Sequence, residues 1–274
     1  MKKIVFRFDI DTHKCIRDGV PNLLKLSRKY NVPFTFFLNT GKSISLGDSM
    51  RSLLKTDNTN HNKGEMMSAM QKLGIVDYIY AAIVNPSIIC YKRQICELLN
   101  SNCEIGIHGG RNHAKWQNYA LEWEQTKLTD EIDYAIDNIK KIKSDYTLKG
   151  FASPAWVHPD TLDKVLKKKG FLYCADYHGI GLNPVIINDK NKTVGVNLLG
   201  EPGGVAFFEN CRVKQYSTEQ IINYVMEFIE RHEVTVLYDH PYYAGVKEID
   251  CISQIIEKIQ IRKDINICTL EQLL

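Results

Sequence analysis

The chain has 274 residues, of which 44% are hydrophobic and 24% are charged, close to the averages of globular proteins. This composition excludes a disordered chain, a coiled coil and a collagen-like repeat. The 35 basic and 32 acidic residues leave a net charge of +3. That balance argues against nucleic acid as the main partner, because proteins that bind it carry a strong basic excess.

Neither the N-terminus nor any internal segment has the pattern of a targeting or membrane-spanning sequence. Arg7 and Asp9 interrupt the first apolar run, whereas a secretory signal needs about 7–15 uninterrupted apolar residues. The most apolar stretch, residues 74–91, contains an Asp, an Asn and a Pro and so fails as a span of about 18 residues. No Cys-x-x-Cys pair occurs among the eight cysteines. We therefore expect reduced thiols in a cytoplasmic protein.

Short apolar runs alternate with amphipathic stretches along the chain. The apolar runs predict strands at residues 3–8, 33–38, 103–107, 148–152, 171–175 and 234–237. Helical spacing predicts helices at residues 20–30, 122–144, 160–169, 218–231 and 252–259. This alternation favours an α/β fold with a parallel sheet, and about seven such units favour a barrel formed by one domain, residues 1–274. An open doubly wound sheet is the alternative, but no Gly-x-Gly-x-x-Gly follows the first strand.

Two regions interrupt this alternation. Residues 41–91 form a long insertion that begins polar and ends apolar, and insertions of this length are usually functional or mobile. The apolar part either lies in a membrane interface or lines a groove for an isoprenoid, or it is a buried helix that covers the barrel. Residues 179–211 are rich in Gly and Asn and predict loops with short strands.

Residues able to carry out chemistry gather where the predicted strands end, which is where parallel barrels place catalytic groups. They are Asp9, Asp11, His108, His113, Asp176 and His240. A metal-assisted hydrolase needs such a set of carboxylates and imidazoles.

Asp9 and Asp11 point to the same side of an extended strand. Neighbouring carboxylates bind a cation, or differ in pKa so that one acts as a base; the alternative is an exposed acidic strand end neutralised by Arg7. His108 and His113 flank a Gly-rich loop that can bend to bring both rings onto one ion. Two imidazoles and a carboxylate form a typical zinc site with one position open for water. The alternative is a pair of surface histidines.

The ordered motifs resemble the polysaccharide deacetylase (NodB-homology) family, and within it the branch that deformylates undecaprenyl-phosphate-linked formamido-arabinose. The resemblance covers residues 3 to 274 and rests on Phe8-Asp9-Ile10-Asp11-Thr12, Glu104-Ile105-Gly106-Ile107-His108 with His113 and Trp116-Gln117, Tyr173-Cys174-Ala175-Asp176, and His240 with Gly245. It implies a distorted (β/α)7 TIM-like barrel.

The resemblance also implies a role for each matching residue. Asp9 corresponds to the catalytic base and His240 to the general acid that protonates the leaving amine. Asp11, His108 and His113 correspond to the ligands of a divalent metal, zinc first, with cobalt or nickel as alternatives.

Two departures from the family pattern stand out. The third motif, residues 151–156, lacks the Arg that usually orients the base, and Arg7 and Arg111 are the candidates to replace it. The His motif is one residue longer than in the most similar branch, with Asn112 where a His is expected.

Further residues are expected near the substrate. Asp176 is expected to steady His240 or the substrate, with a turn-capping role as the alternative. Trp156 and Arg111 are expected to line the substrate site, although a core position is the alternative for Trp156. The remaining histidines are expected on the surface or in loops: His13, His61, His158, His178 and His232.

The function expected from this sequence is metal-dependent removal of an N-formyl or N-acetyl group from an amino sugar, either a glycan precursor or an undecaprenyl-phosphate-linked sugar. Peripheral contact with the inner face of the membrane would accompany a lipid-linked substrate. The alternatives are a metal-free C–N hydrolase of the same fold that acts on a cyclic amide or ureide, and a non-catalytic binder of a sugar or polyprenyl phosphate. The sequence leaves the oligomeric state open.

Overall fold

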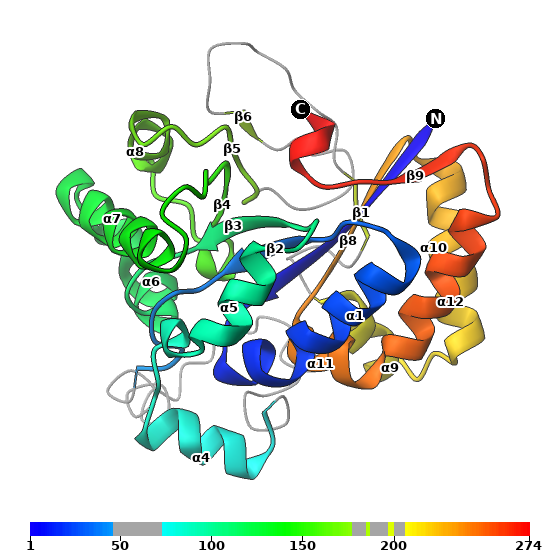
Figure 1. Ribbon diagram of the computed structural model, residues 1–274, viewed down its shortest axis with the longest axis horizontal. Coiled ribbons are helices and arrows are strands. Elements are labelled where there is room, and N and C mark those ends of the chain that lie inside the picture. Colours follow the sequence, from blue (N-terminus) through cyan, green and yellow to red (C-terminus); the bar gives the residue numbers. More distant parts are fainter. Residues whose placement is uncertain (46–72, 177–184, 187–196, 200–205) are drawn as a thin grey trace, which may run out of the picture.

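The structure, a computed structural model, describes residues 1–45, 73–176, 185–186, 197–199 and 206–274 (Figure 1). Its centre is a sheet with the strand order β6-β5-β4-β3-β2-β1-β8-β7, and β9 pairs with the start of β1. The strands are β1 (Lys2–Ile10), β2 (Thr35–Leu38), β3 (Glu104–His108), β4 (Gly150–Ala152), β5 (Tyr173–Cys174), β6 (Val185–Ile186), β7 (Asn197–Leu199), β8 (Val234–Asp239) and β9 (Ile265–Ile267). All described pairings are parallel except that of β5 with β6. This barrel-like parallel sheet confirms the predicted fold class.

Helices cover the outside of the sheet (Figure 1). They are α1 (Val20–Tyr30), α4 (Ile75–Ile83), α5 (Lys92–Leu99), α6 (His113–Tyr119), α7 (Gln125–Ile142), α8 (Leu162–Lys168), α9 (Phe207–Val213), α10 (Thr218–Arg231), α11 (Pro241–Lys247) and α12 (Ile249–Gln260). Short turns of π- or 3₁₀-helix lie at η1 (Cys15–Gly19), η2 (Ile88–Cys90), η3 (Ala120–Glu122), η4 (Pro154–Trp156) and η5 (Glu271–Leu273). The predicted bounds of α1 and α10 agree with the structure to the residue.

Strand β1 separates the helix-side core from the interior of the barrel. Because side chains alternate along a strand, Phe6, Phe8 and Ile10 pack into the core beneath the helices. Val5 packs on the opposite face with residues of β2, β4, β5 and β8. Arg7 and Asp9 follow on that interior face, and both are buried. The alternation therefore places polar groups inside the barrel, at the carboxyl end of β1.

The region 179–211 differs in part from its prediction. Two short strands, β6 and β7, lie in it as expected, but its last residues begin α9 rather than continuing a loop. Phe207 and Phe208 are buried, and the Asp239 carboxylate accepts the backbone N–H of Phe208 at 2.6 Å. Tertiary contacts of this kind stabilise a short helix that local sequence does not indicate. Residues 177–184, 187–196 and 200–205 lie outside the described part.

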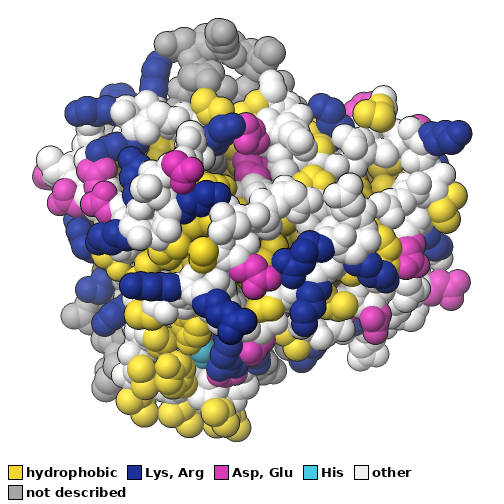
Figure 2. Space-filling model, viewed as in Figure 1, with side chains coloured by type: hydrophobic (Ala, Val, Ile, Leu, Met, Phe, Trp, Pro, Cys, Tyr) yellow, Lys and Arg dark blue, Asp and Glu magenta, His cyan; other side chains and the backbone are white. Residues whose placement is uncertain are grey.

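The described end of the insertion forms α4, whose apolar side faces outward. Val76 is 81% exposed and Ile83 is 75% exposed, and Ile75, Ile79 and Val84 are also exposed. In Figure 2 hydrophobic side chains gather at the lower end of the molecule, where Figure 1 places α4. Only Ala81 of this helix is buried, so the alternative of a buried covering helix is wrong. Within the described residues, no helix is both long and apolar enough to cross a membrane. Residues 46–72 of the insertion lie outside the described part.

Candidate metal centre and active site

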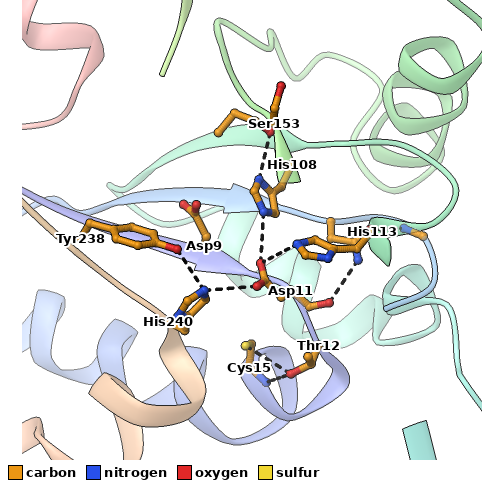
Figure 3. Close-up of polar contacts among 12 residues, drawn as sticks. Asp9, Asp11, Thr12, Cys15, His108, His113, Ser153, Tyr238 and His240 are labelled. Atoms are coloured by element: carbon orange, nitrogen blue, oxygen red, sulfur yellow. Dashed lines mark hydrogen bonds and ion pairs between the residues drawn. The ribbon is translucent and has the colours of Figure 1, made fainter. Parts of the chain in front are cut away.

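Three predicted metal ligands meet at the carboxyl ends of β1 and β3 (Figure 3). Oδ1 of Asp11 lies 3.1 Å from Nε2 of His108 and 3.5 Å from Nε2 of His113. One ligand atom of each residue lies within 4.8 Å of the others, as binding to a single ion requires. The expected grouping of these three residues is therefore what the structure contains.

The hydrogen bonds around this cluster leave its lone pairs free. Nδ1–H of His108 donates to the carbonyl of Ala152 at 2.9 Å, so a neutral ring presents the lone pair of Nε2 to Asp11. Oδ1 of Asp11 and Nε2 of His113 are buried and have no hydrogen-bond partner. Buried polar atoms are rarely left in this state. Three facing lone pairs fit a bound cation, and a set of two imidazoles and one carboxylate suits zinc.

The same environment holds Asp11 in its charged form. Burial alone would raise the pKa of the Asp11 carboxyl, but the imidazoles of His113, His240 and His108 hold that pKa well below its usual range. An ionised carboxylate is the form that binds a metal.

The loop after β3 explains how the longer His motif still delivers His113. Gly109 adopts φ +72°, a conformation that L side chains rarely adopt. A Cβ on Gly110 would lie 2.5 Å from Oε2 of Glu131. Asn112 then caps α6, because its side chain accepts the backbone N–H of Lys115 at 2.9 Å. The additional residue thus serves as a helix cap, and His113 becomes the first residue of α6.

Arg7 contacts Asp9 directly. Its Nε and Nη2 lie 3.0 and 2.8 Å from the two Asp9 oxygens, a bidentate pair that is almost completely buried. Nη1 of Arg7 also donates to the carbonyl of Ala175 at 2.7 Å. In contrast, the Arg111 guanidinium is half exposed and lies 4.5 Å from the ring centre of Tyr134. Of the two candidates to replace the missing Arg, it is Arg7 that reaches Asp9.

Aromatic rings enclose the Arg7 guanidinium. It lies 4.3 Å from the ring centre of Trp156, 4.8 Å from that of Phe37 and 5.2 Å from that of Tyr238. Cation–π contacts of this kind are strongest where the cation is shielded from water. Trp156 is only partly buried, and the contact we find for it is with Arg7 and Tyr238. Its contact with substrate stays a prediction.

His240 lies between two carboxylates and a phenol. Its Nε2 is 3.2 Å from Oδ2 of Asp11 and 3.1 Å from the hydroxyl of Tyr238, and its Nδ1 is 3.3 Å from Oε1 of Glu209. Burial disfavours the charged ring, but Asp11 and Glu209 outweigh that effect and raise the pKa of His240 well above its usual value. In Figure 3, Asp9 lies beside Tyr238 and His108, close to this group.

Besides Asp11, the carboxylate that contacts His240 is Glu209 and not Asp176. Glu209 lies in α9, and the hydroxyl of Tyr242 also donates to it. Glu209 was not predicted, because the composition of residues 179–211 indicates loops with short strands. A signal was present in the polar Glu209-Asn210 pair that follows two phenylalanines, but nothing in the sequence placed it opposite β8.

Asp176 instead fixes the turn after β4. Its carboxylate accepts the backbone N–H and the hydroxyl of Ser153 at 2.5 and 2.6 Å, and it lies 2.7 Å from Nδ1 of His158. Ser153 follows Ala152, whose carbonyl accepts the proton of His108. Asp176 thus holds the turn next to the residue that accepts from His108, and this agrees with the alternative of a turn-capping residue.

The histidines expected on the surface behave differently from one another. His13 is 1% exposed and lies 3.1 Å from Oδ1 of Asp77 in α4. His158 is held between Asp176 and Asp163. His158 lies in a loop and is partly exposed, as expected, whereas the expectation was wrong for His13, which is buried and pairs with a carboxylate of the insertion. His232, at the end of α10, is partly exposed, and His61 and His178 lie outside the described residues.

The sequence profile of the polysaccharide deacetylase family matches residues 1–174. The probable 4-deoxy-4-formamido-L-arabinose-phosphoundecaprenol deformylase ArnD of Shewanella sediminis is 26% identical over 185 residues, which cover 65% of this chain and 57% of that protein. The match thus spans less than two thirds of this relative.

Solved structures share the fold at low sequence identity. The catalytic domain of a peptidoglycan N-acetylglucosamine deacetylase from Eubacterium rectale is 15% identical, with a TM-score of 0.54 over 100% of this chain and 90% of that one. A CE4 family pseudoenzyme from Bacillus anthracis is 12% identical, with a TM-score of 0.54 over 99% and 65%. These likenesses concern the fold alone. The profile match over more than half of its length identifies the chain as a member of the polysaccharide deacetylase family.

Proposed function

We propose that the protein is a metal-dependent hydrolase that removes an N-formyl or N-acetyl group from an amino sugar. The observation that carries this proposal is the convergence of three lone pairs, from Asp11, His108 and His113, beside Asp9 and His240. Family membership supports deacylation of a carbohydrate.

The three ligand residues would hold the ion, and zinc fits their chemistry best, with cobalt or nickel as alternatives. When bound, such a metal polarises the amide carbonyl and makes a water molecule more acidic.

The chain's own residues then move the protons. Asp9 accepts a proton from the water that attacks the carbonyl carbon, while Arg7 fixes the direction in which its carboxylate faces. His240 donates a proton to the amide nitrogen, so that the C–N bond breaks and a free amine leaves. Glu209 and Tyr238 hold the His240 ring in place. The products are the amino sugar and formate or acetate.

A lipid-linked sugar is the substrate we favour. Its support is the named activity of the Shewanella sediminis relative, together with the exposed apolar side of α4. This helix is tied to the site, since Asp77 on its polar side lies 3.1 Å from Nε2 of His13, two residues after Asp11. In this proposal α4 rests on a membrane surface and the metal cluster faces the sugar headgroup.

Release of formate and acetate tests the proposed activity. The zinc-loaded protein is incubated with N-formyl and N-acetyl derivatives of 4-amino-4-deoxyarabinose and of glucosamine. We expect hydrolysis of at least one of them, reduced about 10²- to 10⁴-fold in Asp9→Asn and in His240→Asn. His232→Asn, which lies outside the site, serves as the control. No release from any of these amides, or full activity in Asp9→Asn, would contradict the proposal.

A further inference from the structure

A basic pocket lies beside the loop that carries His113. It has a volume of about 360 Å³, large enough for a small polar ligand. Its charged lining consists of Lys42, Arg111, Lys115, Lys127 and Glu131. Four cations thus face one carboxylate.

The single carboxylate of this pocket is already engaged. Glu131 is 4% exposed, accepts the backbone N–H of Arg111 at 2.6 Å and pairs with Lys127 at 2.5 Å. Lys42 and Lys115 are exposed, and among the described residues neither contacts a carboxylate. The Arg111 guanidinium lies over the ring of Tyr134, and its Nε is 3.9 Å from Oε1 of Glu131, so this one carboxylate faces both Arg111 and Lys127. The pocket therefore keeps an excess of positive charge that no described side chain neutralises.

Other described pockets lack this one-sided charge. One of them is lined by Arg28 and Glu97, which pair at 3.0 Å, so its charges cancel. Another contains two lysines and Asp250. The chain as a whole carries only +3, and the excess around Arg111 is therefore a local feature.

The pocket lies beside the residues that precede His113 and close to the segment that follows α4. Arg111 and Asn112 line it, and His113 follows them directly. On the other side, Nδ2 of Asn112 donates to the carbonyl of Ile44 at 3.1 Å, and Asn85, just after α4, accepts the backbone N–H of Ile44 at 3.3 Å. The pocket lining is therefore adjacent in sequence to His113, and hydrogen bonds link it through Ile44 to the residue that follows α4.

We propose that this pocket binds the phosphate group of the substrate, with the acylated sugar extending to the metal cluster and an apolar chain extending along α4. Arg111 offers a planar pair of donors, and the lysines offer mobile point charges, which together suit a tetrahedral phosphate oxyanion. The inference rests on the proposed function, because it assigns the group that links sugar to lipid.

Isothermal titration calorimetry with farnesyl phosphate, farnesol and inorganic phosphate tests the pocket on the full chain. Lys42→Ala/Lys115→Ala removes two exposed charges of the pocket. Lys140→Ala/Lys263→Ala removes two exposed charges elsewhere and matches the net charge. We expect farnesyl phosphate to bind at least tenfold more weakly to the pocket variant than to the control variant, and the wild-type affinity to fall with added salt.

The other ligands identify the source of the phosphate. Binding of farnesyl phosphate but not of farnesol supports a lipid phosphate, whereas lysine-dependent binding of inorganic phosphate with equal affinity supports a pocket for free phosphate. Equal affinities in the two double variants would overturn the proposal.

The two proposals can fail separately. If no amide is hydrolysed while lysine-dependent phosphate binding persists, the proposed activity is refuted and the proposed phosphate pocket is supported. If a phosphate-bearing amide is hydrolysed and the pocket variant keeps the wild-type KM, the proposed phosphate pocket is refuted and the proposed activity is supported.

Discussion

Replacing Arg7 by Met tests the contact between Arg7 and Asp9. Arg7 is 2% exposed, and its guanidinium binds both oxygens of the Asp9 carboxylate, which is equally buried. Methionine fills much of the same space but leaves the Asp9 charge without its partner. It also leaves the carbonyl of Ala175 without the donor that it has at 2.7 Å.

The structure sets the size of the effect. Removing one member of a buried ion pair costs about 3–5 kcal/mol of unfolding free energy, because the other charge stays desolvated. We expect Arg7→Met to fall in this range. Asp9→Asn should also destabilise the protein, because it leaves the Arg7 guanidinium buried between aromatic rings without a negatively charged partner.

Urea unfolding of both single variants and of Arg7→Met/Asp9→Asn completes a double-mutant cycle. We expect the double variant to lose at least about 2 kcal/mol less than the sum of the two single losses, since removing both charges leaves neither unpaired. Arg7→Lys keeps the positive charge but not the two planar donors of the guanidinium, and it should therefore recover only part of the stability lost in Arg7→Met. Losses that add to within about 0.5 kcal/mol would refute a direct interaction.

Three more predictions follow from other parts of the structure. His158 has its pKa raised to about 9, because Asp163 and Asp176 outweigh the effect of burial. Its stabilisation is therefore complete below about pH 6.5 and is lost as the pH rises through 9; allowing for solvent screening, we expect about 1–2 kcal/mol. Chemical unfolding of wild type and His158→Gln between pH 6 and 10 checks this, and a constant difference would contradict it. Gly110→Ala should destabilise by about 1–3 kcal/mol in thermal unfolding, since its Cβ would meet Glu131; unchanged stability would show that the loop can move. Val76→Glu/Ile83→Glu should abolish co-sedimentation with anionic lipid vesicles while leaving the unfolding midpoint within about 2 °C of wild type; undiminished co-sedimentation would remove α4 from the membrane contact.

The sequence was most informative where local pattern and tertiary structure agree. The apolar spacing of residues 20–30 and 218–231 defined two helices to the residue. Alternation along β1 placed Arg7, Asp9 and Asp11 on one side, and the rule for strand ends brought His108 and His240 toward them.

Contacts between distant segments were the part that local pattern could not supply. Arg7 and Asp9 are neighbours on one strand, so their pairing was within reach, but Arg111 remained an equal candidate until the loop geometry was known. Glu209 reaches His240 only because α9 packs against β8. His13 pairs with Asp77, which belongs to the insertion, and His158 pairs with Asp176, which lies on a different strand end.

The most direct test of the account is the zinc content of the purified protein after incubation with zinc and gel filtration. Elemental analysis should find about one zinc per chain in the wild type and in His232→Ala. It should find little or none in His108→Ala, because the site then loses one of its three ligands. The same zinc content in His108→Ala as in the wild type, or no zinc in any of the proteins, would contradict a metal centre formed by Asp11, His108 and His113.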